Sequence, residues 1–87
     1  MNIISEKELR LAVALAKPVE VLDLPTYAYN KVKRRCGAGT VADVCEADLT
    51  GRLYKGWGIG KKTVYEIEQA IDSYLKDLGY EFERKEE

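Results

Sequence analysis

An all-α fold is predicted by three features of the sequence. Apolar residues recur at helical spacing in several stretches, capping residues and glycines mark the ends of those stretches, and no hairpin signal occurs. We expect a compact four-helix domain with a helix-hairpin-helix motif over residues 18–79. An N-terminal helical extension over 1–17 should precede this domain, and a charged tail over 80–87 should follow it.

The extension should be a helix that a capping box of Ser5 and Glu8 opens. Pro18 should end it near Lys17, because the residue before a proline avoids the α region. Its apolar stripe consists of Leu9, Ala12, Val13 and Ala16. Such a regular stripe should not face water, so we expect it to pack against the domain or against a second copy of the chain.

The first domain helix is expected over residues 27–36, after an apolar connector over 19–25 that is not a strand. Thr26 should cap this helix, and the glycines of 37–39 should stop it. Its inward stripe should consist of Tyr29, Val32 and Cys36.

Two short helices should follow. Thr40 and Asp43 form a second cap pair, which predicts a helix with Val41, Val44 and Cys45 turned inward. The next short helix should begin at Asp48 or Thr50, with Leu49, Leu53 and Tyr54 as its apolar residues.

The clearest helix follows the stretch around residues 55–63. Its inward positions are Val64, Ile67, Ile71, Leu75 and Leu78, and Gly79 should end it. Tyr80 and Phe82 should add a little packing before the tail.

The composition argues against catalysis. The chain has no histidine, which removes the commonest general base and metal ligand. Cys36 and Cys45 are nine positions apart, without the paired spacing of a zinc site, so we interpret them as buried free thiols rather than a disulfide. We therefore expect no enzyme activity, no cofactor and no metal. No apolar run has the length of a membrane span, and the acidic start is unlike a signal peptide, which predicts a cytoplasmic protein.

The net charge of −1 conceals an uneven distribution. Residues 25–63 hold eight Lys and Arg against three acids, whereas residues 64–87 hold three against eight. A basic middle beside an acidic end favours a one-sided surface for an anion. Ordinary solvated helix faces are the alternative.

The segment "KGWGIGKKT" at residues 55–63 combines glycines with lysines. Gly58 and Gly60 should flank a buried Ile59, and the long helix should begin directly after them. A phosphate could then bind its free amides, with Lys61 and Lys62 adding charge. This pattern is that of the helix-hairpin-helix motif, which grips nucleic-acid backbone. A purely structural corner is the alternative, and the spacing does not fit a Walker loop.

Three segments of the sequence match motifs of a known protein family: "PVEVLDLPTYAYNKVKRR", "TVADV" and "GIGKKTVYEI". They occur in the same order as in that family and at nearly the same separations. They resemble the C-terminal domain of the bacterial RNA polymerase alpha subunit. The resemblance implies a bacterial, transcription-related domain that binds the AT-rich DNA minor groove and contacts sigma factors and activators. It is open whether the chain is an excised domain or a free-standing small protein.

The resemblance also implies roles for individual residues. Asn30 matches the minor-groove asparagine of the family, and Lys33 matches the lysine three positions later. The glycine, lysine and serine that hold phosphate in the family are matched by Gly60, Lys62 and Thr63.

Two acids match as well. Glu66 matches an acid at the rim of the DNA surface, and Asp23 matches one of the acids that face sigma, although Val21 replaces its acidic companion.

The sequence departs from the family at several positions. Tyr27 stands where the family has its groove-inserting arginine, and Lys31 replaces a small residue, which restores one charge. An extra residue occurs near Asp48–Gly51, and residues 1–17 look helical where the family has a flexible linker.

The sequence is therefore consistent with two functions. The first is DNA binding through two helix N-termini, near Tyr27–Lys31 and Gly60–Thr63. The second is a protein-interaction module of the same fold, contacting polymerase, a sigma factor or a regulator. Trp57 is either a core plug or a partner-binding ring, and a homodimer through the N-terminal helix is a further possibility.

Overall fold

Four α-helices and two short helical segments make up the fold of residues 5–82, the part of the chain that this computed structural model describes. The α-helices are α1 (Glu6–Ala16), α2 (Thr26–Asn30), α3 (Val41–Leu49) and α4 (Lys61–Asp77). A 3₁₀ helix, η1 (Val19–Leu22), precedes α2, and a π-helical segment, η2 (Lys31–Arg35), continues it. No strand forms in residues 5–82, which confirms the all-α prediction.

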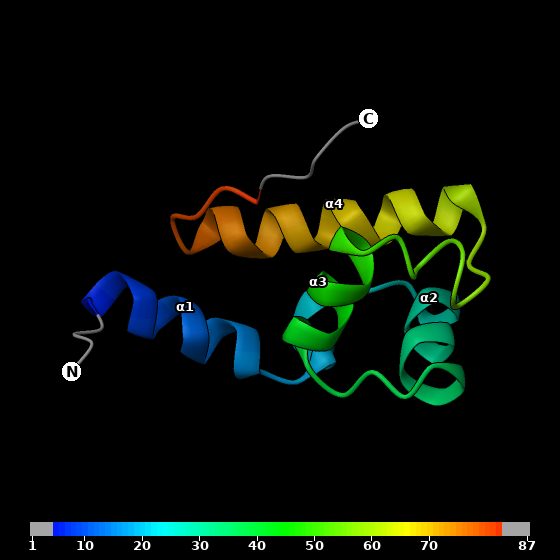
Figure 1. The fold of residues 1–87 in the computed structure, drawn as a ribbon, viewed down its shortest axis with the longest axis horizontal. Helices are drawn as coiled ribbons and strands as arrows, with labels where there is room; N and C mark the ends of the chain where they lie inside the picture. The colour runs from blue at the N-terminus through cyan, green and yellow to red at the C-terminus, as the bar shows by residue number, and fades with distance from the viewer. Residues whose placement is uncertain (1–4, 83–87) are drawn as a thin grey trace.

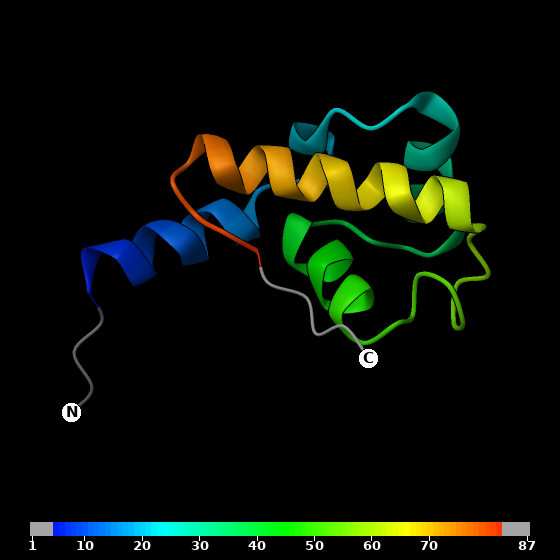
Figure 2. The ribbon, with the colours of Figure 1, turned by 90° about the horizontal axis from the view of Figure 1, so that it is seen from above.

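The other helices are arranged along helix α4. It runs along one side of the molecule, with α2 near its N-terminal end and α1 near its C-terminal end (Figure 1). Seen from above, η1 and α2 lie on one side of α4, and α3 lies on the other (Figure 2). The start of α4 and the start of α2 are therefore at the same end of the molecule, opposite α1.

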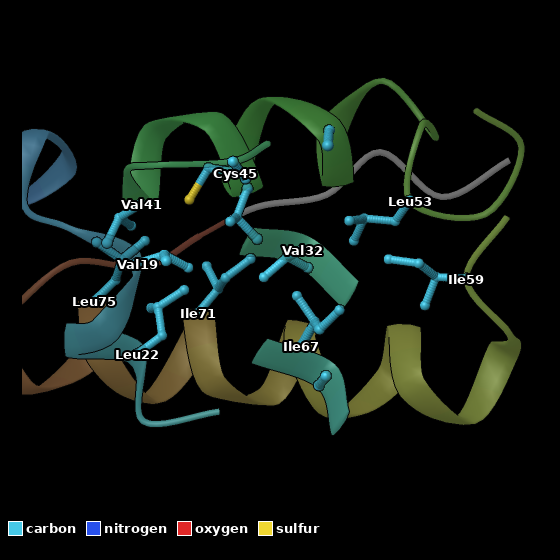
Figure 3. Packing of buried hydrophobic residues seen from close by; sticks show 14 residues of the cluster. Val19, Leu22, Val32, Val41, Cys45, Leu53, Ile59, Ile67, Ile71 and Leu75 are labelled. Carbon is cyan, nitrogen blue, oxygen red and sulfur yellow. The ribbon is translucent and has the colours of Figure 1, made fainter. Parts of the chain in front are cut away.

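The core lies between α4 and the elements that cover it (Figure 3). Ile67, Ile71 and Leu75 of α4 are at most 2% exposed, which confirms most of the stripe predicted for this helix. They belong to one cluster with buried side chains of η1, η2, α3 and the segment before α4: Val19, Val32, Val41, Val44, Leu53 and Ile59. Val64 is half-buried and still packs against this cluster, whereas Leu78 is exposed, so only the C-terminal end of the predicted stripe leaves the core.

Helix α1 packs on the domain, but with a different face from the predicted one. The Ser5 half of the predicted capping box forms, since the N–H of Glu8 donates to the Ser5 hydroxyl at 3.2 Å, and Lys17 ends the helix before Pro18, as expected. Ala14 is buried and Leu11 and Leu15 pack against the core, whereas Leu9, Ala12, Val13 and Ala16 are exposed. The predicted stripe is therefore not the face that packs on the domain, because a helix with apolar residues around much of its circumference offers two possible faces. Packing of this stripe against a second copy stays a prediction.

Helix α2 begins one residue earlier than predicted and ends differently. Pro25 occupies the N-cap and Thr26 is the first helical residue, so the predicted Thr26 cap is wrong. The helix then continues as a π-helix, in which the N–H of Cys36 donates to the carbonyl of Lys31, five residues back, at 3.1 Å. Ala28 and Val32 face the core, while Tyr29 and Cys36 are only half-buried.

The short helix predicted from Asp48 or Thr50 is absent. Helix α3 continues to Leu49, and residues 50–56 form hydrogen-bonded turns. Gly51 has a φ of 76°, a left-handed conformation that ends a helix. Leu53 then reaches the core, whereas Leu49 and Tyr54 stay more than half exposed. The sequence predicted four domain helices in addition to the N-terminal one, whereas residues 5–82 contain three α-helices in addition to α1.

The capping box of α3 is formed as predicted. The Thr40 hydroxyl accepts from the N–H of Asp43, and the Asp43 carboxylate accepts from the N–H groups of Thr40 and Gly39 at 3.1 and 3.0 Å. These backbone donors lower the pKa of Asp43 from its ordinary 3.8. Because the folded pKa is the lower one, this carboxylate stabilises the fold above pH 3.8, and the contribution is lost as the pH falls through the folded value.

Replacing Asp43 with alanine should lower the free energy of unfolding by about 1 kcal/mol, because two backbone N–H groups lose their acceptor. The measurement is urea unfolding at neutral pH, and Thr40→Ser, which keeps the capping hydroxyl, is the matched control. An unchanged urea midpoint for Asp43→Ala would show that the box contributes nothing.

The C-terminus of α4 closes with a Schellman motif. The N–H of Tyr80 donates to Leu75 and that of Gly79 to Lys76, both at 2.9 Å, with Gly79 at a φ of 89°. Tyr80 and Phe82 pack partly against the core, as predicted, and residues 83–87 of the predicted tail lie outside the described range.

Cys45 is buried and Cys36 half-buried, and both are thiols. Among the helices of residues 5–82, none has the length and apolar character needed to cross a membrane.

Candidate nucleic-acid interface

The turn before α4 has the local structure that its sequence predicts. Ile59 is 1% exposed, and its N–H donates to the carbonyl of Leu53 at 2.9 Å. Gly58 has a φ of 67°, a conformation that favours glycine, whereas Gly60 is extended and forms the N-cap of α4. The buried isoleucine therefore fixes the direction in which α4 begins.

The first turn of α4 presents positive charge to solvent. The Gly60 N-cap has no side chain, so it makes no capping hydrogen bond to the amides of Lys61, Lys62 and Thr63. Lys61 and Lys62 are exposed, and no acid lies in the first turn. Uncapped amides, the helix dipole and two lysines are features that favour an anion at a helix N-terminus.

A hydrogen bond joins the start of α2 to the beginning of α4. The Tyr27 hydroxyl donates to Glu66 Oε1, across 39 positions of sequence. This hydrogen bond, and to a lesser extent burial and the carboxylate charge, raise the pKa of Tyr27, so the tyrosine stays a neutral donor. Tyr27 is 51% exposed, so its ring remains available at the surface.

A recess of about 200 Å³ lies between η2 and the turn before α4. It is lined by Lys31, Arg35, Cys36, Trp57 and Gly58. Burial raises the pKa of the Cys36 thiol, although the neighbouring cations oppose this, so Cys36 stays protonated at neutral pH. Trp57 is half-buried and packs against the core. Its ring is therefore neither a fully buried core plug nor a fully exposed partner-binding ring.

Arg35 is the residue that the sequence-based site omitted. It shares the recess with Lys31, four positions before it, and i,i+4 residues lie on the same side of a helix. That spacing is a signal in the sequence that could have identified Arg35. We refer to Lys31, Arg35, Lys61, Lys62 and the turn Gly58–Gly60 as the basic end.

Three predicted site residues lie elsewhere or have other contacts. Lys33 pairs with Glu20 of η1 at 3.3 Å, and the Tyr29 hydroxyl donates to the same carboxylate. The Tyr29 hydrogen bond, followed by a smaller effect of Lys33, lowers the pKa of Glu20. Asn30 is half-buried in α2, and Asp23 borders a different groove.

That groove, of about 570 Å³, lies along α4 beside η1. Its acidic residues are Asp23, Glu66 and Asp77, and the exposed Val21 and Tyr65 supply apolar surface. We call it the acidic groove. Glu66 lines the acidic groove and also accepts the Tyr27 hydrogen bond, so it connects this groove to the start of α2.

Replacing Gly60 with serine separates an anion site from a structural corner. Nothing lies within 4 Å of a Cβ at Gly60, and its φ of −66° suits any residue. A serine hydroxyl would accept from the α4 amides, so stability should stay equal or rise by a few tenths of a kcal/mol. DNA affinity should fall, because those amides are then occupied. Urea unfolding and fluorescence anisotropy measure the two effects, and unchanged affinity would indicate a structural corner.

Comparisons with known proteins add no assignment to this geometry. No protein-family model, curated protein or solved structure matches the chain. The helix-hairpin-helix motif and the likeness to the polymerase alpha C-terminal domain accordingly remain predictions from the sequence.

Proposed function

We propose that this chain is a DNA-binding domain that holds the phosphate backbone at its basic end. The observation that carries the proposal is the recess in which Lys31 and Arg35 lie beside Gly58, directly before the open N-terminus of α4. The cations of η2 thus lie beside the turn that leads into Lys61 and Lys62 of α4. A transcriptional role follows from the resemblance to the polymerase alpha C-terminal domain.

The mechanism uses two kinds of contact. One phosphate binds the free amides of Gly60–Thr63, with Lys61 and Lys62 beside it. A neighbouring phosphate lies against Lys31 and Arg35. The start of α2, with Tyr27 and Asn30, then faces the minor groove. Phosphate contacts set position and carry no sequence information, so the domain should discriminate weakly among sequences.

The test is a titration of fluorescein-labelled AT-rich and GC-rich duplexes at several salt concentrations, read by fluorescence anisotropy. If the four cations of the basic end contact phosphates, log Kd should rise with log salt with a slope of roughly 3 to 4. Both duplexes should bind with similar affinity. Absence of binding to either duplex at low salt would contradict the proposal.

A charge substitution at Tyr27 shows how far the Glu66 hydrogen bond limits DNA binding. Tyr27→Arg alone should gain little affinity, because the new guanidinium lies within reach of the Glu66 carboxylate and is partly neutralised there. Tyr27→Arg combined with Glu66→Gln should bind AT-rich duplex more tightly, with a salt slope steeper by about 1. Glu66→Gln alone is the matched control. If the double variant gains nothing over this control on either duplex, the start of α2 does not face DNA.

A second candidate function is protein interaction, and the acidic groove favours it. Exposed Tyr65 and Val21 lie among carboxylates, which suits a basic peptide with apolar side chains. In this alternative the partner is polymerase, a sigma factor or a regulator, and Asp23 contacts it. Replacing Asp23 and Asp77 with asparagine would then weaken binding of the protein partner and leave DNA affinity unchanged.

A further inference from the structure

Helix α1 is held to the domain by one face only. The Tyr74 hydroxyl of α4 donates to the carbonyl of Ala14 at 2.9 Å, and the Tyr80 hydroxyl donates to that of Lys7 at 2.8 Å. Ala14 is buried, and Leu11 and Leu15 pack against the core. The contacts that fix α1 thus leave its other apolar stripe outside.

The outer stripe forms a patch with the end of α4. Leu9, Val13 and Leu78 are 57%, 51% and 49% exposed, and all three line a groove of about 420 Å³ whose other walls include Tyr74 and Tyr80. We call this surface the α1 patch. It combines projecting apolar side chains with an apolar hollow, which is what a surface needs in order to bind a copy of itself.

Charges at the ends of the stripe are complementary. Glu6 lies one turn before Leu9, where it also pairs with Arg10 of the same helix at 2.6 Å, and Lys17 lies one turn after Val13, on the same flank of the helix. When two such helices pack antiparallel, residues on the same flank approach each other from opposite ends. Each Glu6 would then meet a Lys17, in two equivalent pairs around a two-fold axis.

We propose that the α1 patch binds a second copy of this chain as an antiparallel, two-fold symmetric dimer. Leu9 of one copy lies against Val13 of the other, each pair entering the groove beside Leu78, and Glu6 lies against Lys17. Helix α1 is about 16 Å long, so the contact is smaller than a standard interface and we expect only a moderate affinity. This proposal does not depend on DNA binding.

Sedimentation equilibrium of the full chain, from low micromolar to millimolar concentration, tests the proposal. The parent should pass from monomer to dimer, and Leu9→Lys and Val13→Lys should each raise the dimer Kd by at least about tenfold. The matched control is Leu49→Lys, because Leu49 is 56% exposed at the far end of α3 and should not affect the Kd. Circular dichroism melting confirms that each variant is folded.

Charge exchange tests the antiparallel arrangement. Glu6→Lys alone and Lys17→Glu alone should each dimerise more weakly than the parent, because each homodimer places like charges together. A mixture of the two variants should form a heterodimer more tightly than either variant binds itself. A parent that stays monomeric, a Leu49→Lys effect as large as that of Leu9→Lys, or a mixture no tighter than the separate variants would each overturn the proposal.

Discussion

Replacing both Lys61 and Lys62 with glutamate should weaken DNA binding by well over tenfold at moderate salt. Both side chains are exposed in the first turn of α4, beside amides that no side chain caps. The change removes two phosphate partners and adds two charges that repel phosphate, so the salt slope should fall by about 2. Fluorescence anisotropy on one duplex at several salt concentrations measures both quantities.

This loss should not come from unfolding. Acids in the first turn of a helix interact favourably with its dipole, so the double variant should be as stable as the parent. The matched control is Lys7→Glu with Lys76→Glu, which changes the net charge equally at the opposite end of the molecule. Equal loss of affinity in the two double variants would mean that total charge, and not the basic end, determines binding.

Truncation of Ile59 to alanine should have the largest effect on stability among the residues of the turn. Its side chain is 1% exposed and packs in the cluster with Leu53, so the truncation leaves a cavity that costs about 2–5 kcal/mol. That is a large fraction of the stability of a typical small domain. Ile59→Val should cost about 0.5–1.5 kcal/mol, and the exposed Leu49→Ala should cost at most about 0.5 kcal/mol.

Urea unfolding of the three variants gives these values. Ile59→Ala should also lower DNA affinity under conditions in which the variant is folded, since Ile59 fixes the position of Gly60 and the α4 amides. If Ile59→Ala costs no more than Leu49→Ala, Ile59 does not anchor the turn.

Elements with local signals were predictable from the sequence. The α4 stripe, the Thr40–Asp43 capping box and the Gly79 stop depend on residues a few positions apart, and all three form. The buried Ile59 between two glycines was predictable for the same reason.

Features that depend on tertiary packing were not predictable. Residue spacing allows α1 two apolar faces, and tertiary contacts select one of them: Leu11 and Leu15 pack against the core, and the hydroxyls of Tyr74 and Tyr80 bond to the α1 backbone. The π-helical turn at Lys31–Arg35 has no composition that distinguishes it from an α-helix, and Gly51 ended α3 where another helix was expected.

The candidate site shows the same limit. Lysines beside a glycine turn indicated the start of α4, but the Tyr27–Glu66 hydrogen bond joins residues 39 positions apart. The meeting of Arg35 with Trp57 likewise requires the folded chain. Lys33 was assigned to DNA because it matches a lysine of the resembled family, whereas in the fold it pairs with Glu20 of η1.

The central claim, that DNA binds at the basic end, is tested most directly by amide chemical-shift mapping. The ¹⁵N-labelled chain is titrated with AT-rich duplex at low salt, and the amide shifts are assigned along the sequence. The account predicts the largest shifts at residues 58–63, with smaller shifts at 27–35. Shifts confined to Asp23, Tyr65 and the rest of the acidic groove, or no shifts at all, would contradict it.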